Sequence, residues 1–311
     1  MKKLRKIISL VLIIGLLLSM GITAFAATIP EKPYDNSKFF GYKDYTLHYR
    51  VYDGDPADKK QVLLVHGFCL STASLEGVAE EYMAAGYDVV TVDAPNFGYS
   101  SRETSNTELL DREEIIHALM CDIGGKWIVG GHSMGGGIAV NIATDYGENV
   151  TGLVLYAPQT NTQATGIMAV MSKTCLMQTM MNMVLKFALR MPALVKILVE
   201  MSFSSKEFAK NYDLSRITAP LSVDGTGAGI SIMSSHTRGS NFEKLSTLDI
   251  PCVIFTASED KVAMADNLQT IIDNAPKDKV VYNFEEGGHM MMEYNPKEVA
   301  KLSLPIMEKC N

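Results

Sequence analysis

The most constraining feature of this sequence is a serine flanked by glycines, set between an apolar run and a stretch of small residues. Residues 127–129 are apolar and lead into Gly131-His132-Ser133-Met134-Gly135, after which small residues are frequent. A sharp turn from a strand into a helix strains its central residue and leaves no room for side chains at the two glycines. The pattern predicts that Ser133 is exposed at the carboxyl end of a sheet, beside a helix N-terminus that favours negative charge. A tight turn with a solvent-facing serine is the alternative.

Apolar runs and helix-like segments alternate along most of the chain. The short runs that are almost entirely apolar lie at 62–65, 89–92, 127–129, 153–156 and 253–255. Such runs are typical of strands buried on both faces of a parallel sheet. Helix-like segments separate them at 74–85, 107–120 and 135–145. The alternation predicts a doubly wound, mostly parallel α/β sheet.

The alternation stops between about residues 161 and 241, where methionine is abundant. One helix face there is apolar at steps of three and four: Met177, Met180, Val184, Phe187 and Met191. Lysine and arginine interrupt the segment, so it has no apolar run long enough to cross a membrane. We expect a helical cap inserted between two strands, with ordinary packing of a larger domain as the alternative. Because thioethers give adaptable apolar surfaces, we expect Met177, Met180 and Phe187 to line a substrate pocket.

The N-terminal residues have the order of a secretory signal peptide. Basic residues between positions 2 and 6 precede an apolar run at 7–20 and the small-x-small site Ala24-Phe25-Ala26. We predict that residues 1–26 are removed and that residues 27–311 form one secreted domain, which contains the cap and no stable membrane span. The alternative is a retained segment that anchors the domain to a membrane. A span needs roughly 20 apolar residues, and this run is shorter.

Charge and cysteine usage narrow the range of partners. The chain has a formal net charge of −7, and loss of the basic N-terminal residues would make it more acidic. A surface this acidic is poorly suited to nucleic acid, so we expect no nucleic-acid partner. The five cysteines follow neither a CxxC nor a zinc-binding pattern. We therefore assign no disulfide pairing and expect no metal site. Nothing in the sequence specifies an oligomeric state.

A serine hydroxyl becomes a strong nucleophile only when a base removes its proton. His289 follows the apparent last strand at 280–284, and the two glycines before it would let the loop bring the imidazole over Ser133. Of the six histidines, it alone comfortably satisfies the chain order serine, acid, histidine. His132 adjoins the serine, but we expect its side chain to diverge at the turn.

An imidazole base needs an acid that accepts its Nδ1–H, fixes the tautomer and stabilises the imidazolium. The apolar strand that starts at residue 251 ends in Ser258-Glu259-Asp260. Asp260 is the predicted acid. Glu259 is the alternative, although we expect it to lie on the loop surface.

The oxyanion of a tetrahedral intermediate needs hydrogen-bond donors. One expected donor is the backbone N–H of Met134, directly after Ser133. The other is the backbone N–H of Phe68, in the loop His66-Gly67-Phe68-Cys69 that follows the strand at 61–65. We expect His66 to stabilise this loop by hydrogen bonding.

The stretches that match one known family pattern are His66-Gly67-Phe68, Asp93-Ala94-Pro95-Asn96-Phe97-Gly98-Tyr99-Ser100, Gly131-His132-Ser133-Met134-Gly135-Gly136, Ser258-Glu259-Asp260-Lys261-Val262 and Gly287-Gly288-His289. Together they resemble the α/β-hydrolase superfamily, within the monoacylglycerol lipase-like group of serine esterases and lipases. The triad and oxyanion positions of that family fall on the residues named above, while Asn96 stands where the family often has glycine. The resemblance implies hydrolysis of an ester or similar acyl bond without a metal or organic cofactor.

We therefore expect a secreted serine hydrolase, carboxylesterase-like or lipase-like, that cleaves small-molecule acyl esters, lipid-like or short, through an acyl-enzyme intermediate. A peptidase or amidase on the same scaffold is the nearest alternative, with Glu200 or Glu207 as candidates to hold a substrate amine. Related dehalogenases and epoxide hydrolases normally carry an aspartate at the position of Ser133. A non-catalytic binding protein would require a broken triad, whereas all three residues are present.

Overall fold

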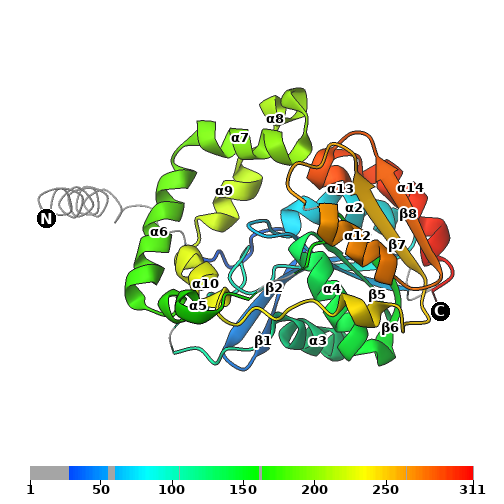
Figure 1. The fold of residues 1–311 in the computed structure, drawn as a ribbon, viewed down its shortest axis with the longest axis horizontal. Helices are drawn as coiled ribbons and strands as arrows, with labels where there is room; N and C mark the ends of the chain where they lie inside the picture. The colour runs from blue at the N-terminus through cyan, green and yellow to red at the C-terminus, as the bar shows by residue number, and fades with distance from the viewer. Residues whose placement is uncertain (1–27, 55–59, 105, 161–162, 264, 311) are drawn as a thin grey trace, which may run out of the picture.

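The computed structural model describes residues 28–310, apart from 55–59, 105, 161–162 and 264 (Figure 1). The predicted signal peptide lies outside the described residues. One sheet of eight strands organises the described part of the chain. In sheet order the strands are β1 (Ser37–Tyr42), β2 (Tyr45–Tyr52), β4 (Asp88–Val92), β3 (Gln61–Val65), β5 (Trp127–His132), β6 (Val150–Tyr156), β7 (Cys252–Ala257) and β8 (Lys279–Phe284).

The sheet is mostly parallel. From β4 to β8 in sheet order every neighbouring pair is parallel, whereas β2 pairs antiparallel with both β1 and β4. This order confirms the doubly wound α/β class that the alternation of strands and helices predicts. In such a sheet the carboxyl ends of the parallel strands meet at one edge, which is where ligands bind in open α/β folds.

Strand β3 shows why these strands are apolar without interruption. Val62 and Leu64 belong to one hydrophobic cluster, while Leu63 and Val65 belong to a second cluster on the opposite face. The first cluster contains residues of α2 (Glu76–Ala84) and α14 (Pro296–Met307). The second contains residues of α3 (Arg112–Ile123), α4 (Met134–Asp145) and α12 (Ala265–Asn274). Both faces are therefore covered, and the four apolar side chains of the strand are buried.

Between β6 and β7 the chain leaves the sheet and forms a series of helices. They are α5 (Gly166–Ser172), α6 (Cys175–Leu189), α7 (Pro192–Phe203), α8 (Lys206–Asn211), α9 (Ser215–Leu221), α10 (Thr226–Met233) and α11 (Phe242–Leu245). Figure 1 shows α5–α10 on one side of the molecule, with α6 along the left edge and α7 along the top. We call α5–α10 the cap. Residues 161–162, at which the predicted insertion begins, lie outside the described residues.

Local signals set the limits of the two longest cap helices. The Thr174 hydroxyl accepts the Met177 N–H and so caps the start of α6. Pro192 opens α7, where its missing N–H costs nothing. Among the helices described, none is long and apolar enough to cross a bilayer. The remaining short elements are η1 (Thr72–Leu75), η2 (Gly147–Asn149), η3 (Gly288–Met290) and α13 (Met291–Tyr294).

Candidate active site

Ser133 occupies the turn between β5 and α4. Its backbone has φ 52° and ψ −116°, a positive-φ conformation that is costly for serine. A Cβ on Gly131 would lie 2.1 Å from the Gly135 carbonyl oxygen, and a Cβ on Gly135 would lie 2.2 Å from the Val65 carbonyl oxygen. Only glycine fits at both positions. The turn can therefore close and hold the half-buried Ser133 side chain at the N-terminus of α4.

His289 and Asp260 meet at the same edge of the sheet, on loops that follow β8 and β7. His289 lies in η3, and its Nδ1 is 2.7 Å from Asp260 Oδ2. Positive φ angles of 89° at Gly287 and 54° at Gly288 turn the chain before the imidazole. The result is a buried histidine whose Nδ1 contacts a carboxylate, as the predicted pair requires.

The Asp260 carboxylate is held as an acceptor. Its Oδ1 accepts the N–H groups of Val262 and Ala263, both at 2.8 Å. Burial by itself raises the pKa of Asp260, but hydrogen bonding to His289 and to these amides outweighs burial and holds the pKa below its ordinary value. Glu259 is exposed, with its carboxylate 4.0 Å from the Lys261 ammonium. Asp260, not Glu259, is therefore the carboxylate that contacts His289.

The contact between the serine and the histidine is looser. Both residues are described, and no hydrogen bond joins Ser133 Oγ to His289. His289 nevertheless lies beside the turn, because its ring centroid is 4.6 Å from that of His132, the neighbour of Ser133. Catalytic hydrogen bonds are often long in ligand-free enzymes and shorten when substrate binds. Ser133 and His289 thus lie on adjoining segments, with no hydrogen bond between their side chains.

The expectation that the His132 side chain diverges from the site is wrong. Its Nε2–H donates to the His289 carbonyl at 2.9 Å, so the side chain ties the serine turn to the histidine loop. Its Nδ1 is buried without a partner among the described residues, and a Cβ on Gly67 would lie 2.6 Å from that atom. Burial, followed by the nearby His289, lowers the pKa of His132 well below its ordinary value. His132 is therefore a neutral imidazole that packs against the loops of His289 and Gly67.

His66 stabilises the loop that carries Phe68, one of the two predicted oxyanion donors. The His66 Nδ1–H donates to the Gly67 carbonyl at 2.7 Å, and its Nε2 accepts the Ala94 N–H at 3.0 Å. Burial lowers the pKa of His66, which favours the neutral ring that these contacts require. No hydrogen bond of the Phe68 N–H is described, and Met134 is the first residue of α4, where N–H groups carry partial positive charge. Both predicted donors therefore lie on segments that adjoin Ser133.

An apolar cavity of about 210 Å³ lies between this loop and the cap. Phe68, Cys69 and Met290 line it on the side of the site, and α6, α7 and α9 line it on the cap side. No charged residue is among its lining. Met290 directly follows His289, so the cavity begins beside the candidate base. An acyl chain is the kind of group that such a cavity can take.

Met177, Met180 and Phe187 are not among the residues that line this cavity. From α6 the lining residues are Leu185, Ala188 and Leu189, whereas Met180 and Phe187 are 43% and 51% exposed. The orientation of α6 follows from its contact with α10, where Asn182 Oδ1 accepts the Ala228 N–H at 2.8 Å. Helix α6 is apolar on more than one face, so periodicity identified an apolar stripe without showing which stripe faces inward.

Asn96 stands where the resembling family often has glycine, and its backbone conformation explains why asparagine can occupy this position. Its φ is 75°, in the left-handed region that asparagine tolerates better than other residues with a side chain. The side chain is also used, because Oδ1 accepts the Glu103 N–H at 2.7 Å and Nδ2 donates to Glu103 Oε2 at 2.6 Å. Asparagine therefore adopts the glycine-like conformation and anchors the loop.

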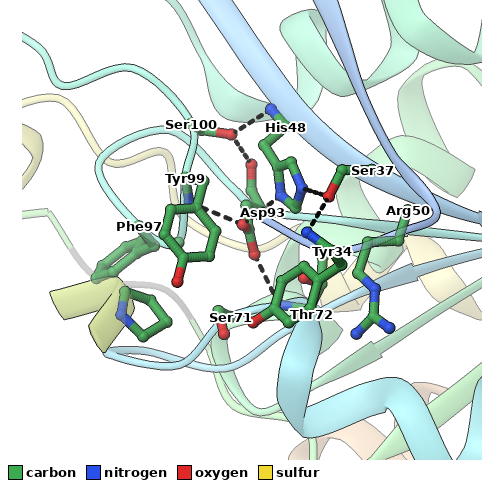
Figure 2. Close-up of polar contacts among 12 residues, drawn as sticks. Tyr34, Ser37, His48, Arg50, Ser71, Thr72, Asp93, Phe97, Tyr99 and Ser100 are labelled. Carbon is green, nitrogen blue, oxygen red and sulfur yellow. Dashed lines mark hydrogen bonds and ion pairs between the residues drawn. The ribbon is translucent and has the colours of Figure 1, made fainter. Parts of the chain in front are cut away.

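A second array of serine, histidine and aspartate lies at the opposite end of the sheet order (Figure 2). Ser37 Oγ is 2.8 Å from His48 Nε2, and His48 Nδ1 is 2.7 Å from Asp93 Oδ2. No sequence pattern pairs His48 with either of these residues. The pairing arises only when β1, β2 and the loop after β4 come together, so no short motif signals it.

The second array is saturated with internal hydrogen bonds. Ser37 Oγ also accepts the Tyr34 N–H at 2.9 Å, and the Asp93 carboxylate accepts the N–H groups of Thr72 and Tyr99 at 2.6 and 2.8 Å. Burial alone raises the pKa of Asp93, but the hydrogen bond and charge of His48 outweigh it and lower the pKa to about 2. Ser37 is the first residue of β1 and follows the turn at residues 35–36, whereas Ser133 directly precedes a helix. This array fastens the edge of the sheet.

The described residues also show how the metal-ligating side chains and the thiols are arranged. No group of three or more described His, Cys, Asp or Glu side chains is arranged to hold a metal ion. The described cysteines are all free thiols. Burial raises the pKa of Cys252 to about 12 and that of Cys310 to about 11, so both remain protonated and unreactive near neutral pH.

Comparison with known proteins gives a family and many related folds. The sequence pattern of a family described as serine aminopeptidase, S33 matches residues 56–295. A putative non-heme chloroperoxidase from Synechocystis sp. is 33% identical over 110 residues, which are 35% of this chain and 40% of that protein. The chain thus spans about two fifths of the length of that curated relative.

Solved structures resemble the chain over most of its length. An esterase from Exiguobacterium antarcticum aligns with a TM-score of 0.64 and 18% identity, covering 87% of this chain and 99% of the esterase. An enol-lactonase from Burkholderia xenovorans LB400 aligns with a TM-score of 0.67 and 13% identity, covering 87% of this chain and 100% of the lactonase. At these identities the likeness establishes the fold.

Proposed function

Because the chain belongs to the serine aminopeptidase S33 family and is a hydrolytic enzyme of the α/β-hydrolase fold, we propose that it cleaves carboxylic esters with Ser133 as nucleophile. The observation that carries the proposal is the Asp260–His289 pair, hydrogen-bonded at 2.7 Å beside the strained Ser133 turn. Ser133, Asp260 and His289 follow β5, β7 and β8, and the parallel sheet brings the ends of these strands to one edge.

The roles of the three residues follow from their contacts. Asp260 accepts the Nδ1–H of His289, which leaves Nε2 as the basic atom. Nε2 takes the Ser133 proton while Oγ attacks the carbonyl carbon of the ester. The negative charge that develops on the carbonyl oxygen is met by the N–H groups of Phe68 and Met134.

Three further proton transfers complete the cycle. Collapse of the tetrahedral intermediate breaks the bond to the alcohol, which receives the proton from His289 and leaves an acyl group on Ser133. Water then gives its proton to Nε2 and attacks the acyl carbon. The second intermediate collapses to the carboxylic acid, and the proton returns from His289 to Ser133.

The cavity favours an acyl ester over a peptide. Its lining is apolar, so a methylene chain would be desolvated there without leaving a charge unpaired. The cap acids considered for a substrate amine lie elsewhere, since Glu200 is 3.8 Å from Lys206 and Glu207 lines a different, polar pocket. Neither acid lines the cavity next to Met290.

The test is a comparison of p-nitrophenyl esters from acetate to palmitate with aminoacyl p-nitroanilides. We expect esters to be hydrolysed and aminoacyl amides to be poor substrates. Leu185→Asn, in the cavity wall, should lower the octanoate-to-acetate ratio of kcat/KM roughly tenfold. Met180→Asn, on the exposed face of the same helix, is the matched control and should leave the ratio unchanged. Faster turnover of the amides would favour the peptidase alternative.

We also propose that the enzyme is secreted after removal of residues 1–26. The support is the order of basic, apolar and small residues in that segment. N-terminal sequencing of the protein from the culture medium should begin at Ala27. A chain that keeps Met1 and sediments with membranes would show that the segment is retained as an anchor.

A further inference from the structure

The cap carries an apolar surface that no described element covers. Along α6 and just beyond its end, five apolar residues recur at steps of four, four, three and four, and each is between 41% and 72% exposed: Leu176, Met180, Val184, Phe187 and Met191. This is nearly the stripe that the sequence predicts as a pocket wall, and it faces outward. Exposed apolar patches larger than those of ordinary monomers mark sites of interaction.

Helix α7 extends the surface toward the candidate active site. Leu194, Ile197, Leu198 and Met201 are exposed on it, while Val195, Val199 and Phe203 are buried against the rest of the protein. Leu194 and Leu198 are also part of the wall of the apolar cavity. The exposed surface of α6 and α7, which we call the cap face, is therefore continuous with the cavity wall at Leu194 and Leu198.

The charges around the cap face differ in sign from those of the chain as a whole. Between residues 166 and 203 the basic residues are Lys173, Lys186, Arg190 and Lys196, and the single acidic residue is Glu200. The whole chain has a net charge of −7. Lys173, Arg190 and Lys196 are exposed. An apolar face bordered by basic residues is the pattern of a segment that rests on an anionic lipid surface.

A lipid surface fits the cap face better than a second copy does. A twofold contact through this face would bring Lys173, Arg190 and Lys196 close to their own copies, and like charges across an interface are unfavourable. The exposed side chains are aliphatic or thioether apart from Phe187. Protein interfaces are enriched in Tyr, Trp and Arg at their centres, whereas a fluid bilayer requires only apolar area.

We propose that the cap face docks on anionic lipid surfaces and presents the cavity mouth at Leu194 and Leu198 to the acyl chains. The docking does not depend on the chemistry proposed for Ser133, so it is tested in the Ser133→Ala background. In that background docking is measured without any acyl transfer to Ser133. A failed docking experiment would not contradict the proposed hydrolysis of soluble esters. A failure to hydrolyse such esters would likewise not contradict the docking.

Two exposed cysteines provide a local test. Cys175 begins α6 next to Leu176, and Cys121 lies on α3 among the helices that cover the sheet. A polarity-sensitive nitrobenzoxadiazole probe is attached to Cys175 in a Cys121→Ser chain and to Cys121 in a Cys175→Ser chain. Each full-length protein is titrated with phosphatidylglycerol vesicles, phosphatidylcholine vesicles and vesicles with brominated acyl chains.

The Cys175 probe should shift to the blue with phosphatidylglycerol vesicles and be quenched by brominated chains, while the Cys121 probe stays unchanged. Each probe reports only its own surroundings, so attachment through another segment does not affect the comparison. Lys173→Gln and Lys196→Gln should each weaken the response roughly fivefold. Val184→Glu should abolish it, and Ile123→Glu, at an exposed site on α3, should not.

Three outcomes would overturn the proposal. A Cys175 probe that does not respond to anionic vesicles would show that the cap face is not in contact with lipid. Equal responses at Cys175 and Cys121 would indicate unspecific adsorption. A blue shift at Cys175 that grows with protein concentration in the absence of vesicles would identify a second copy as the occupant.

Discussion

The molecule contains two arrays of serine, histidine and aspartate, and they differ in how far their hydrogen bonds are used. In the array of Figure 2, Ser37 binds His48 at 2.8 Å and also accepts a backbone N–H. At the other site His289 binds Asp260 at 2.7 Å, while the Ser133 hydroxyl has no described partner. By contact geometry alone, the first array has the more complete triad.

The difference shows that residue types and distances do not by themselves define a nucleophile. Ser37 lies in a strand whose neighbours consume its bonding capacity, so the array joins β1, β2 and β4 into a stable edge. Ser133 lies at a strained turn, half-buried, beside a helix N-terminus, and the apolar cavity is lined by Met290, the residue after His289. Unused bonding capacity next to a space for substrate is what separates a reactive group from a structural one.

The largest expected contrast is between Ser133→Ala and Ser37→Ala. The first should lower kcat on p-nitrophenyl butyrate by on the order of 10⁴–10⁶-fold with the fold intact. The second should leave kcat unchanged and lower the free energy of unfolding by about 1 kcal/mol. Steady-state kinetics and urea denaturation measure the two effects. Activity within tenfold of wild type in Ser133→Ala would remove the basis of the comparison.

Substitution of the two aspartates should show the same contrast, with a loss of activity at one position and a loss of stability at the other. Asp260→Asn should lower kcat by on the order of 10⁴-fold, because the amide favours the wrong tautomer of His289. Asp93→Asn should leave the kcat of the folded protein unchanged and lower the free energy of unfolding by about 3 kcal/mol. An amide cannot accept from Thr72, Tyr99 and His48 together. If Glu259→Gln lowers kcat more than Asp260→Asn does, the assignment of the acid is wrong.

The pH dependence of activity and of stability should also come from different arrays. His289 must be neutral to accept a proton, so kcat/KM should fall on acidification. A flat profile from about pH 5 to pH 9 would contradict a histidine base.

The stability supplied by Asp93 should disappear at lower pH. Its pKa of about 2 in the folded protein lies below the ordinary 3.8. The stabilisation is therefore fully present above about pH 4 and is lost as the pH falls through about 2. The stability difference between wild type and Asp93→Asn should shrink by roughly 2 kcal/mol over that range, as followed by urea unfolding. A difference that stays constant down to pH ~2 would contradict this role.

The smallest expected effect concerns His132, which positions His289 without contacting substrate. His132→Leu removes the donor to the His289 carbonyl and should lower kcat by roughly tenfold to a hundredfold, with KM for a short ester unchanged. His132→Gln keeps a donor near the position of Nε2 and should restore most of the rate. Equal losses in kcat for both variants would indicate that only packing matters at this position.

Local sequence patterns predicted the fold and the positions of Ser133, Asp260 and His289, because each of these residues follows a strand that is recognisable by its apolar run. The contacts of His132 and the Ser37–His48–Asp93 array depend on segments that are distant in sequence, so no spacing rule indicated them. The expectation that Met177, Met180 and Phe187 line the cavity chose the wrong face of α6 for a different reason. Helix α6 is apolar on more than one side, and only its packing on α10 determines which side reaches the cavity.

The central claim is that Ser133, and not Ser37, is the activated serine. The most direct test is to treat the protein with a fluorophosphonate probe and to locate the label by peptide mass spectrometry. We predict stoichiometric labelling of the peptide that contains Ser133, no labelling of the peptide that contains Ser37, and loss of the label in Ser133→Ala. A label on Ser37, or hydrolytic activity that survives full labelling of Ser133, would contradict the account.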